Sequence, residues 1–102
     1  MTDLTIESVE EPRGLRLSGE LDLASVPELD AALRPMAATG GQITLDVSTL
    51  RFMDSSAVQL LIRTLQSLGG RGRVTLLRPM TSVRRLINVM GLTRFENLDV
   101  RE

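Results

Sequence analysis

The run from Arg51 to Ala57 is the feature that most constrains the fold, because it joins two segments of different hydrophobic period. The segment before it alternates apolar and polar residues, as a half-buried strand does. Its apolar positions are Ile43, Leu45 and Val47. The segment after it carries an apolar stripe at helical spacing. This stripe consists of Ala57, Leu61, Leu65 and Leu68, with Val58 and Ile62 beside it. The run therefore lies between a strand and a helix, where α/β folds usually place functional residues.

Three consecutive polar residues stand at the expected start of this helix. Asp54, Ser55 and Ser56 can each accept a hydrogen bond from a free N–H group of the first turn, so one of them is expected to be the N-cap. A cap alone is the simpler interpretation, but a cap needs only one such residue. Of the two apolar residues upstream, Phe52 and Met53, one can pack against the first turn while the other stays exposed beside the serines. This combination favours a contact surface.

The residue types that the chain lacks exclude most catalytic mechanisms. It has no histidine and no cysteine, and all 12 of its basic residues are arginine. These absences rule out a Ser-His-Asp hydrolase, a thiolate nucleophile and a Schiff-base lysine. A hydrolase elbow would also need glycines where Met53 and Ala57 stand. Residues 69–73 are better explained as a helix stop and turn than as a nucleotide loop. We therefore expect a protein that is not an enzyme and that holds no metal and no cofactor.

The length indicates one domain covering residues 1–102, and the lack of a membrane span and of a signal-peptide pattern predicts a cytoplasmic protein. No apolar run is long enough to span a membrane, and the N-terminus, residues 1–3, lacks a signal-peptide pattern. Residues 1–54 carry 10 acidic side chains and four arginines, whereas residues 55–102 carry eight arginines and three acidic side chains. Folding can mix these charges; alternatively, an acidic patch near Glu20, Asp22 and Asp54 attracts a basic partner surface. A net charge of -1 and only two aromatic residues argue against direct nucleic-acid binding.

Turn and cap signals predict the elements of the first half of the chain. Strands over residues 4–8 and 15–17 flank a turn with proline and glycine, which predicts an antiparallel hairpin. Residues 19–22 are expected to form a loop. Ser25 is the predicted cap of the next helix, with Glu28 at the capping-box position. Pro35 is expected to kink or end that helix before the two glycines at 40 and 41.

The second half of the chain continues the alternation. Gly69-Gly70 ends the central helix, and residues 73–76 form the next strand. A third helix begins at residues 79–82 and stops at Gly91, and a short edge strand lies near residues 97–100. Polar residues occupy the second face of the predicted strands; these are Thr44, Asp46, Arg73 and Thr75. The fold is therefore expected to be α/β, with a mixed, mainly parallel sheet of four to five strands and helices packed mainly on one face, rather than doubly wound.

Over residues 4–98 the sequence resembles the STAS domain family, specifically the bacterial anti-sigma factor antagonists, which would make residues 1–102 a single STAS domain with a βα superhelix. Three motifs carry the resemblance. They are Leu17-Ser18-Gly19-Glu20-Leu21-Asp22, the run from Leu45 through Phe52-Met53-Asp54-Ser55-Ser56, and Val89-Met90-Gly91-Leu92. The resemblance implies that Ser55 is phosphorylated by an anti-sigma factor that is also a serine kinase, and that a metal-dependent serine phosphatase reverses the modification.

The resemblance also implies a contact surface for the anti-sigma factor. Its expected residues are Glu20, Asp22, Met53, Asp54, Ser56, Ala57 and Gln59. The family usually has Gly-Leu-Gly after the serine pair, whereas this chain has Ala57-Val58-Gln59. Binding would release a sigma factor, and phosphorylation would switch binding off. The alternative is a STAS module that is not phosphorylated and serves as a subunit of another regulatory or lipid-transport assembly. An exposed sheet face and an edge strand permit a monomer or a weak homodimer.

Overall fold

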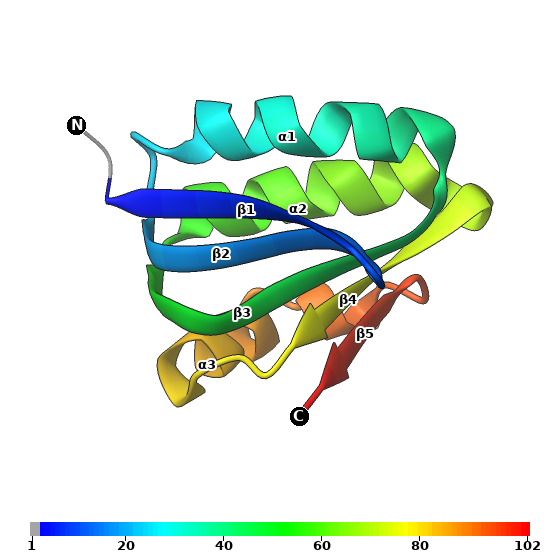
Figure 1. The fold of residues 1–102 in the computed structure, drawn as a ribbon. Coiled ribbons are helices and arrows are strands. Elements are labelled where there is room, and N and C mark those ends of the chain that lie inside the picture. Colours follow the sequence, from blue (N-terminus) through cyan, green and yellow to red (C-terminus); the bar gives the residue numbers. More distant parts are fainter. Residues whose placement is uncertain (1–2) are drawn as a thin grey trace.

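The computed structural model describes residues 3–102 (Figure 1). Residues 1 and 2 lie outside the described residues, and so does most of the segment in which the sequence shows no signal-peptide pattern. The strands and helices follow the predicted order. They are β1 (Leu4–Glu10), β2 (Arg13–Leu21), α1 (Val26–Thr39), β3 (Gly41–Met53), α2 (Ser55–Leu68), β4 (Gly72–Leu77), α3 (Thr81–Val89) and β5 (Leu98–Arg101). Short 3-10 turns follow α2 at Gly69–Arg71 and α3 at Leu92–Arg94.

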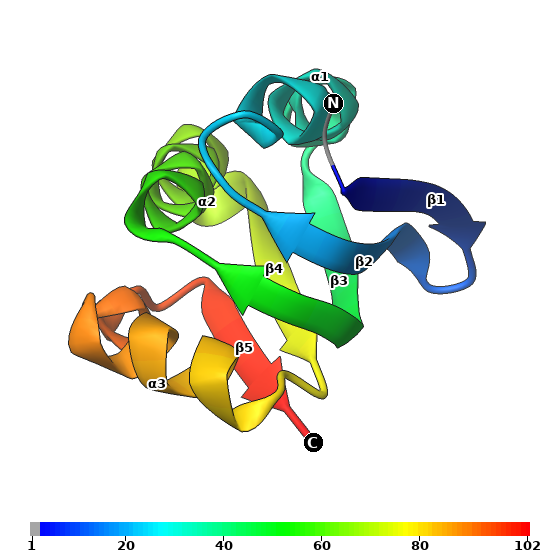
Figure 2. The same cartoon turned by 90° about the vertical axis from the view of Figure 1, so that its left-hand side faces the viewer.

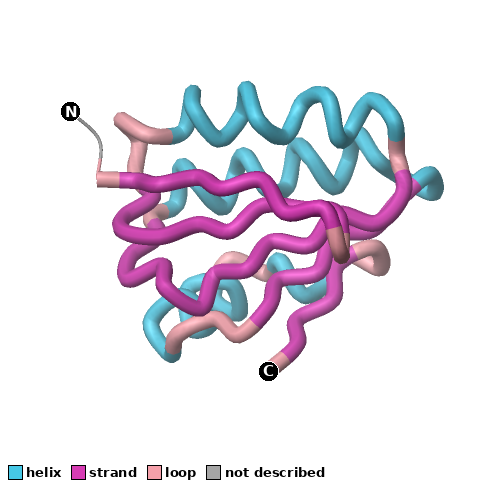
Figure 3. Tube along the Cα trace, viewed as in Figure 1, coloured by secondary structure: helices cyan, strands magenta, loops and turns pink. Residues whose placement is uncertain are grey.

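The five strands form one sheet in the order β1-β2-β3-β4-β5. β1 runs antiparallel to β2, and the other neighbours are parallel. The three helices lie on the same side of the sheet, as the two views of the ribbon and the traced backbone show (Figures 1, 2 and 3). This arrangement confirms the one-sided, mainly parallel α/β fold and excludes a doubly wound sheet.

The core lies between the sheet and the helices. The apolar residues of β3 and the apolar stripe of α2 supply its centre, as their periods predict. The buried apolar members in these two elements are Ile43, Leu45, Val47, Leu50, Met53, Ala57, Val58, Leu60, Leu61, Leu65 and Leu68. Leu29 and Leu33 of α1 and Val83 and Ile87 of α3 extend this core.

The structure differs from two local predictions. Glu20 and Leu21 are the last residues of β2 rather than part of a loop, because they pair with Phe52 and Met53 of a longer β3. α1 continues through Pro35 to Thr39, so the proline does not end the helix. Packing of one helix face on the core overrides the local cost of the missing N–H group.

The predicted capping box at the start of α1 also differs from the structure. Ser25 occupies the N-cap position, but its side chain makes no cap hydrogen bond. The Ser25 hydroxyl instead accepts a hydrogen bond from the backbone N–H of Asp22 at 3.0 Å and lies 3.1 Å from the Asp22 carbonyl oxygen. Because this buried hydroxyl closes the turn over residues 22–25, it fixes the loop between β2 and α1.

The second half of β3 has a helix, not a strand, beside its outer edge. β3 pairs with β4 only from Gly41 to Asp46, because β4 ends at Leu77. The chain then passes through Arg78, whose φ of 53° is left-handed, and enters α3. α3 packs against β3, below the plane of α1 and α2 in Figure 1. The end of β3 therefore lies between α2 and α3.

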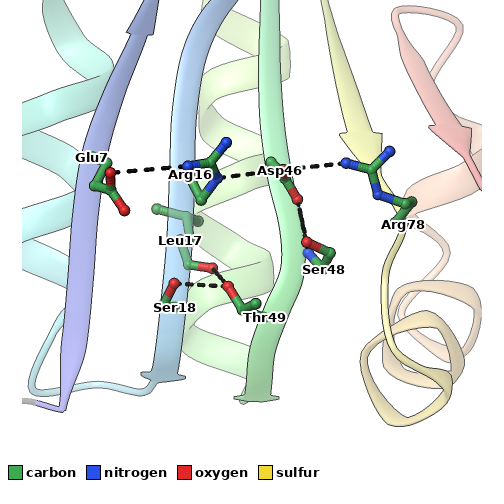
Figure 4. A network of polar contacts seen from close by, with 8 residues as sticks. All are labelled: Glu7, Arg16, Leu17, Ser18, Asp46, Ser48, Thr49 and Arg78. Atoms are coloured by element: carbon green, nitrogen blue, oxygen red, sulfur yellow. Dashed lines mark hydrogen bonds and ion pairs between the residues drawn. The ribbon is translucent and has the colours of Figure 1, made fainter.

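The face of the sheet opposite the helices carries a chain of polar contacts (Figure 4). Asp46 lies between two arginines, with an oxygen 3.6 Å from Arg16 and 3.4 Å from Arg78. Burial of the Asp46 carboxyl group opposes its ionisation, but hydrogen bonds from Ser48 and the two guanidinium charges together lower its pKa. Glu7 pairs with Arg16 from β1. Charged side chains on this face explain why no helix covers it.

Candidate functional site

The two sequence motifs meet where β2 and β3 end. Glu20 lies opposite Phe52 and Leu21 opposite Met53 in the parallel ladder. The N–H group of Asp54 then donates to the carbonyl oxygen of Leu21 at 3.2 Å. The loop after β2 and the start of α2 are therefore held side by side at the carboxyl edge of the sheet.

Asp54 is the N-cap of α2, and its carboxylate organises the site. Oδ1 accepts hydrogen bonds from the Ala57 N–H group at 3.2 Å and from the Ser56 hydroxyl at 2.5 Å. Oδ2 accepts from the backbone N–H of Leu23 at 3.2 Å. Burial opposes ionisation of Asp54, but these hydrogen bonds, led by that of Ser56, lower its pKa below the ordinary value. One ionised side chain thus joins the helix start to the loop after β2.

Ser55 is the first residue of α2 and is exposed. Its hydroxyl makes no hydrogen bond within residues 3–102, in contrast to that of Ser56, which is partly buried and donates to Asp54. The hydroxyl therefore lies free at the positive end of a helix dipole. The chain contains no histidine, the side chain that most often acts as a general base, and the adjacent Asp54 carboxylate already accepts three hydrogen bonds. The arrangement suits a group that a partner modifies.

The predicted acidic residues Glu20 and Asp22 lie at the end of β2 and in the loop held beside the start of α2, and both already have partners. Glu20 forms an ion pair with Arg51 of the neighbouring strand. The Asp22 carboxylate accepts from the backbone N–H of Ala24 at 3.1 Å and lies 3.3 Å from the Ser25 hydroxyl. These contacts shape the loop and leave the negative field of the site centred on Asp22 and Asp54.

Two of the residues expected at the contact surface are not on it. Ala57 is fully buried, because the apolar stripe of α2 begins there and faces the sheet. The side chain of Met53 is only 6% exposed, since it lies on the inner side of β3 at the strand end. Ala57 and Met53 therefore belong to the core beneath the site rather than to its exposed surface. Gln59, one turn after Ser55, is exposed as expected of a contact residue.

The structure adds one exposed apolar residue to the site that sequence patterns missed. Leu23 is 72% exposed, although its backbone N–H group is fixed by Asp54. Phe52, 47% exposed, is the apolar neighbour of the serines that remains accessible. A single leucine in a polar loop has no periodicity, so only the fold reveals that Leu23 lies beside Asp54.

The described part of the chain contains neither a cluster of metal-binding side chains nor a helix that could span a membrane. Among residues 3–102, no group of three acidic side chains gathers closely enough to hold a metal ion. Over the same residues, every helix is too short or too polar to cross a membrane.

Comparison with known proteins identifies the family. The family model described as Mlab, STAS domain, matches residues 4–100. An anti-sigma-B factor antagonist of Staphylococcus aureus is 30% identical over 94 residues, which cover 88% of this chain and 87% of that protein. The anti-sigma factor antagonist SpoIIAA in its unphosphorylated form is similar with a TM-score of 0.72 and 27% identity, over 95% of this chain and 86% of that one. The phosphorylated form of SpoIIAA, a Bacillus cell fate determinant, is similar with a TM-score of 0.66 and 26% identity, over 95% of this chain and 89% of that one. The chain belongs to the STAS domain family.

Proposed function

We propose that this chain is an anti-sigma factor antagonist and that Ser55 is its phosphorylation switch. The observation that carries the proposal is the exposed Ser55 hydroxyl at the start of α2, next to the Asp54 cap. The curated relative from Staphylococcus aureus bears this functional name, and SpoIIAA has been solved with and without phosphate. The unmodified chain binds an anti-sigma factor, which then releases its sigma factor.

The contact surface consists of exposed or partly exposed residues around the serine. We assign to it Ser55 and its neighbours Glu20, Asp22, Leu23, Phe52, Asp54, Ser56 and Gln59. Because the carboxylates of this set outnumber its cations, a basic surface on the partner fits it best. Leu23 and Phe52 provide apolar contacts at the edge of the charged centre.

Phosphorylation transfers the terminal phosphoryl group of ATP to the Ser55 oxygen, releases the hydroxyl proton and leaves ADP. The partner kinase supplies the catalytic groups, since this chain has no histidine and its Asp54 carboxylate is engaged in holding the helix start. The phosphate brings about 1.5 to 2 negative charges next to Asp54. In a docked interface the phosphate loses its hydration beside the Asp54 carboxylate, and we expect this cost to exceed its attraction to a basic partner surface, so binding weakens. A metal-dependent serine phosphatase restores the hydroxyl by hydrolysis.

The geometry favours Ser55 over Ser56 as the acceptor. The Ser56 hydroxyl donates to Asp54 at 2.5 Å, so a kinase would have to break that hydrogen bond before transfer. Ser55 needs no such rearrangement, because its side chain is exposed. Ser56 therefore acts as a structural residue of the helix start.

The test is intact-mass analysis after incubation with ATP and the candidate serine-kinase anti-sigma factor encoded in the same genome. We expect one added phosphate in the parent chain and in Ser56→Ala, located on Ser55 by fragmentation, and none in Ser55→Ala. Ser56→Ala is the matched control, because it removes the neighbouring hydroxyl and leaves Ser55 in place.

A phosphate that appears on Ser56, or that persists in Ser55→Ala, would overturn the assignment of the switch. Binding without any phosphate would favour the alternative function, a STAS subunit that binds its partner constitutively in another regulatory or lipid-transport assembly.

A further inference from the structure

A shallow groove lies beside the candidate site, between the end of β3 and α3. Its volume is about 310 Å³. It is lined by Phe52, Met53, Ser82, Arg85, Leu86 and Val89, and we call it the α3 groove. It exists because β4 ends at Leu77 and leaves the second half of β3 to pack against a helix. Met53 directly precedes the Asp54 cap, so the groove adjoins the phosphorylation surface.

α3 packs one apolar face into the core and presents a second face, with both apolar and polar residues, to the groove. The core stripe contains Val83 and Ile87, which are both buried. The groove residues of α3 follow helical spacing on a neighbouring face, and they are Ser82, Arg85, Leu86 and Val89. Val89 is 77% exposed and Phe52, across the groove, is 47% exposed. Val89 and Phe52 therefore offer exposed apolar contacts that line the same groove.

The charge of the groove is opposite to that of the serine site. Arg85 is exposed, and its guanidinium has no ion-pair partner among the described residues 3–102. The preceding residue, Arg84, pairs with Glu102 instead. α3 contains no acidic residue, so nothing on the helix neutralises Arg85. The groove therefore fits an apolar side chain next to a carboxylate, whereas the surface around Asp22 and Asp54 fits a cation.

We propose that the α3 groove is a second contact site for the anti-sigma factor and that it receives a partner segment with a bulky apolar residue next to an acidic one. This inference rests on the proposed function. The partner then docks in a fixed direction, with its basic groups at the start of α2 and its acidic-apolar segment on α3. The groove shares Phe52 with the contact surface but does not include Ser55, so its contribution to affinity can be measured in a chain that cannot be phosphorylated at Ser55.

The experiment uses Ser55→Ala as the background, so that phosphorylation cannot affect the result. Binding to the purified serine-kinase anti-sigma factor of the same genome is measured by titration calorimetry for this variant alone and with Arg85→Glu or Val89→Ser added. We expect at least a tenfold loss of affinity for Arg85→Glu and about a tenfold loss for Val89→Ser. Added salt should weaken the Ser55→Ala variant more than the Arg85→Glu variant, because only the former retains the ion pair.

Arg94→Glu is the matched control, because it makes the same charge change at an exposed arginine away from the groove. Arg94 lies with Gly72 and Asn97 where β4 begins, at the opposite edge of the sheet from Ser55. Its affinity should stay within twofold of the background. Thermal unfolding of each variant shows that the fold is retained.

The outcomes separate this inference from the proposed function. Unchanged affinity in Arg85→Glu, or an equal loss in Arg94→Glu, overturns the groove and leaves the phosphorylation switch intact. Sedimentation that shows self-association dependent on Arg85 and Val89 also overturns it, since a second copy would then fill the groove. Failure of the Ser55→Ala chain to bind any anti-sigma factor overturns the proposed function and the groove together.

Discussion

At the scale of single residues, Asp54 performs two structural tasks with one side chain. One oxygen caps α2 through the Ala57 N–H group, and the other holds the loop after β2 through the Leu23 N–H group. The carboxylate also lies next to Ser55, so it sets the electrostatic field that a phosphate at Ser55 would meet. The helix start and the proposed switch therefore depend on the same charge, which makes Asp54 the most informative residue to change.

Asp54→Asn should lower the free energy of unfolding by about 1 kcal/mol at pH 7, because it removes the charge and replaces one acceptor by a donor. The folded-state pKa of Asp54 is lowered, so the stability that its ionised form contributes is present above the usual carboxyl pKa and is lost as pH falls through the folded value. The difference between parent and variant in urea unfolding should therefore shrink below about pH 4. A difference that is constant from pH 7 to pH 3 would contradict this explanation.

At the scale of elements, the periodic segments were predictable and the local exceptions were not. The alternation of Ile43, Leu45 and Val47 and the stripe of α2 gave the central strand and helix, because burial of one face decides both. The position of the serine pair, at the helix start and the carboxyl edge of the sheet, followed from these elements. Two residues of the site were not placed correctly. Ala57 belongs to the apolar stripe and is buried, although the family resemblance implied a contact residue there. Leu23 gave no signal, because only the fold brings it beside Asp54.

Turn signals near the hairpin show the same limit. Gly14 reads as a turn residue, but it lies inside β2 opposite Thr44. A Cβ atom at Gly14 would lie 1.7 Å from the Thr44 carbonyl oxygen, so this glycine permits close approach of two strands rather than a turn. Local sequence does not distinguish these two uses of glycine, because the contact is formed by residues far apart in the chain.

The proline inside α1 provides a prediction at this scale. Pro35 is exposed and lacks the N–H group that would bond within the helix, yet α1 continues to Thr39. Pro35→Ala should restore that hydrogen bond and raise the free energy of unfolding by about 2 kcal/mol, after allowance for the freer unfolded chain. Pro35→Gly is the matched control, and its gain should be about 1 kcal/mol smaller, because glycine is a poorer helix former. Urea unfolding measures both, and a loss of stability in Pro35→Ala would show that the ring packs favourably in α1.

At the scale of the whole molecule, the fold separates stability from recognition. The core lies between the helices and one face of the sheet, and the charged chain from Glu7 through Asp46 to Arg78 occupies the other face (Figure 4). The candidate site lies at the carboxyl edge, where Ser55 is exposed and is not part of the hydrophobic core. A charge added at this edge is expected to change what the molecule binds without changing how it folds.

Phosphorylation of Ser55 should therefore leave the fold intact and abolish useful binding. In the free domain the phosphate stays hydrated, and the N-terminal dipole of α2 offsets part of its repulsion by Asp54. The thermal midpoint of the phosphorylated chain should lie within about 4 °C of the unmodified one, which corresponds to roughly 1 kcal/mol for a domain of this size. Its affinity for the anti-sigma factor should fall about 100-fold or more, because an interface must desolvate the phosphate next to a carboxylate. The Ser55→Glu variant should bind the anti-sigma factor weakly. The Ser55→Ala variant should bind it with the same affinity as the unmodified chain. Calorimetric scanning and titration on the same samples provide both values, and a large loss of thermal stability in the phosphorylated chain would place the switch in the fold instead of the interface.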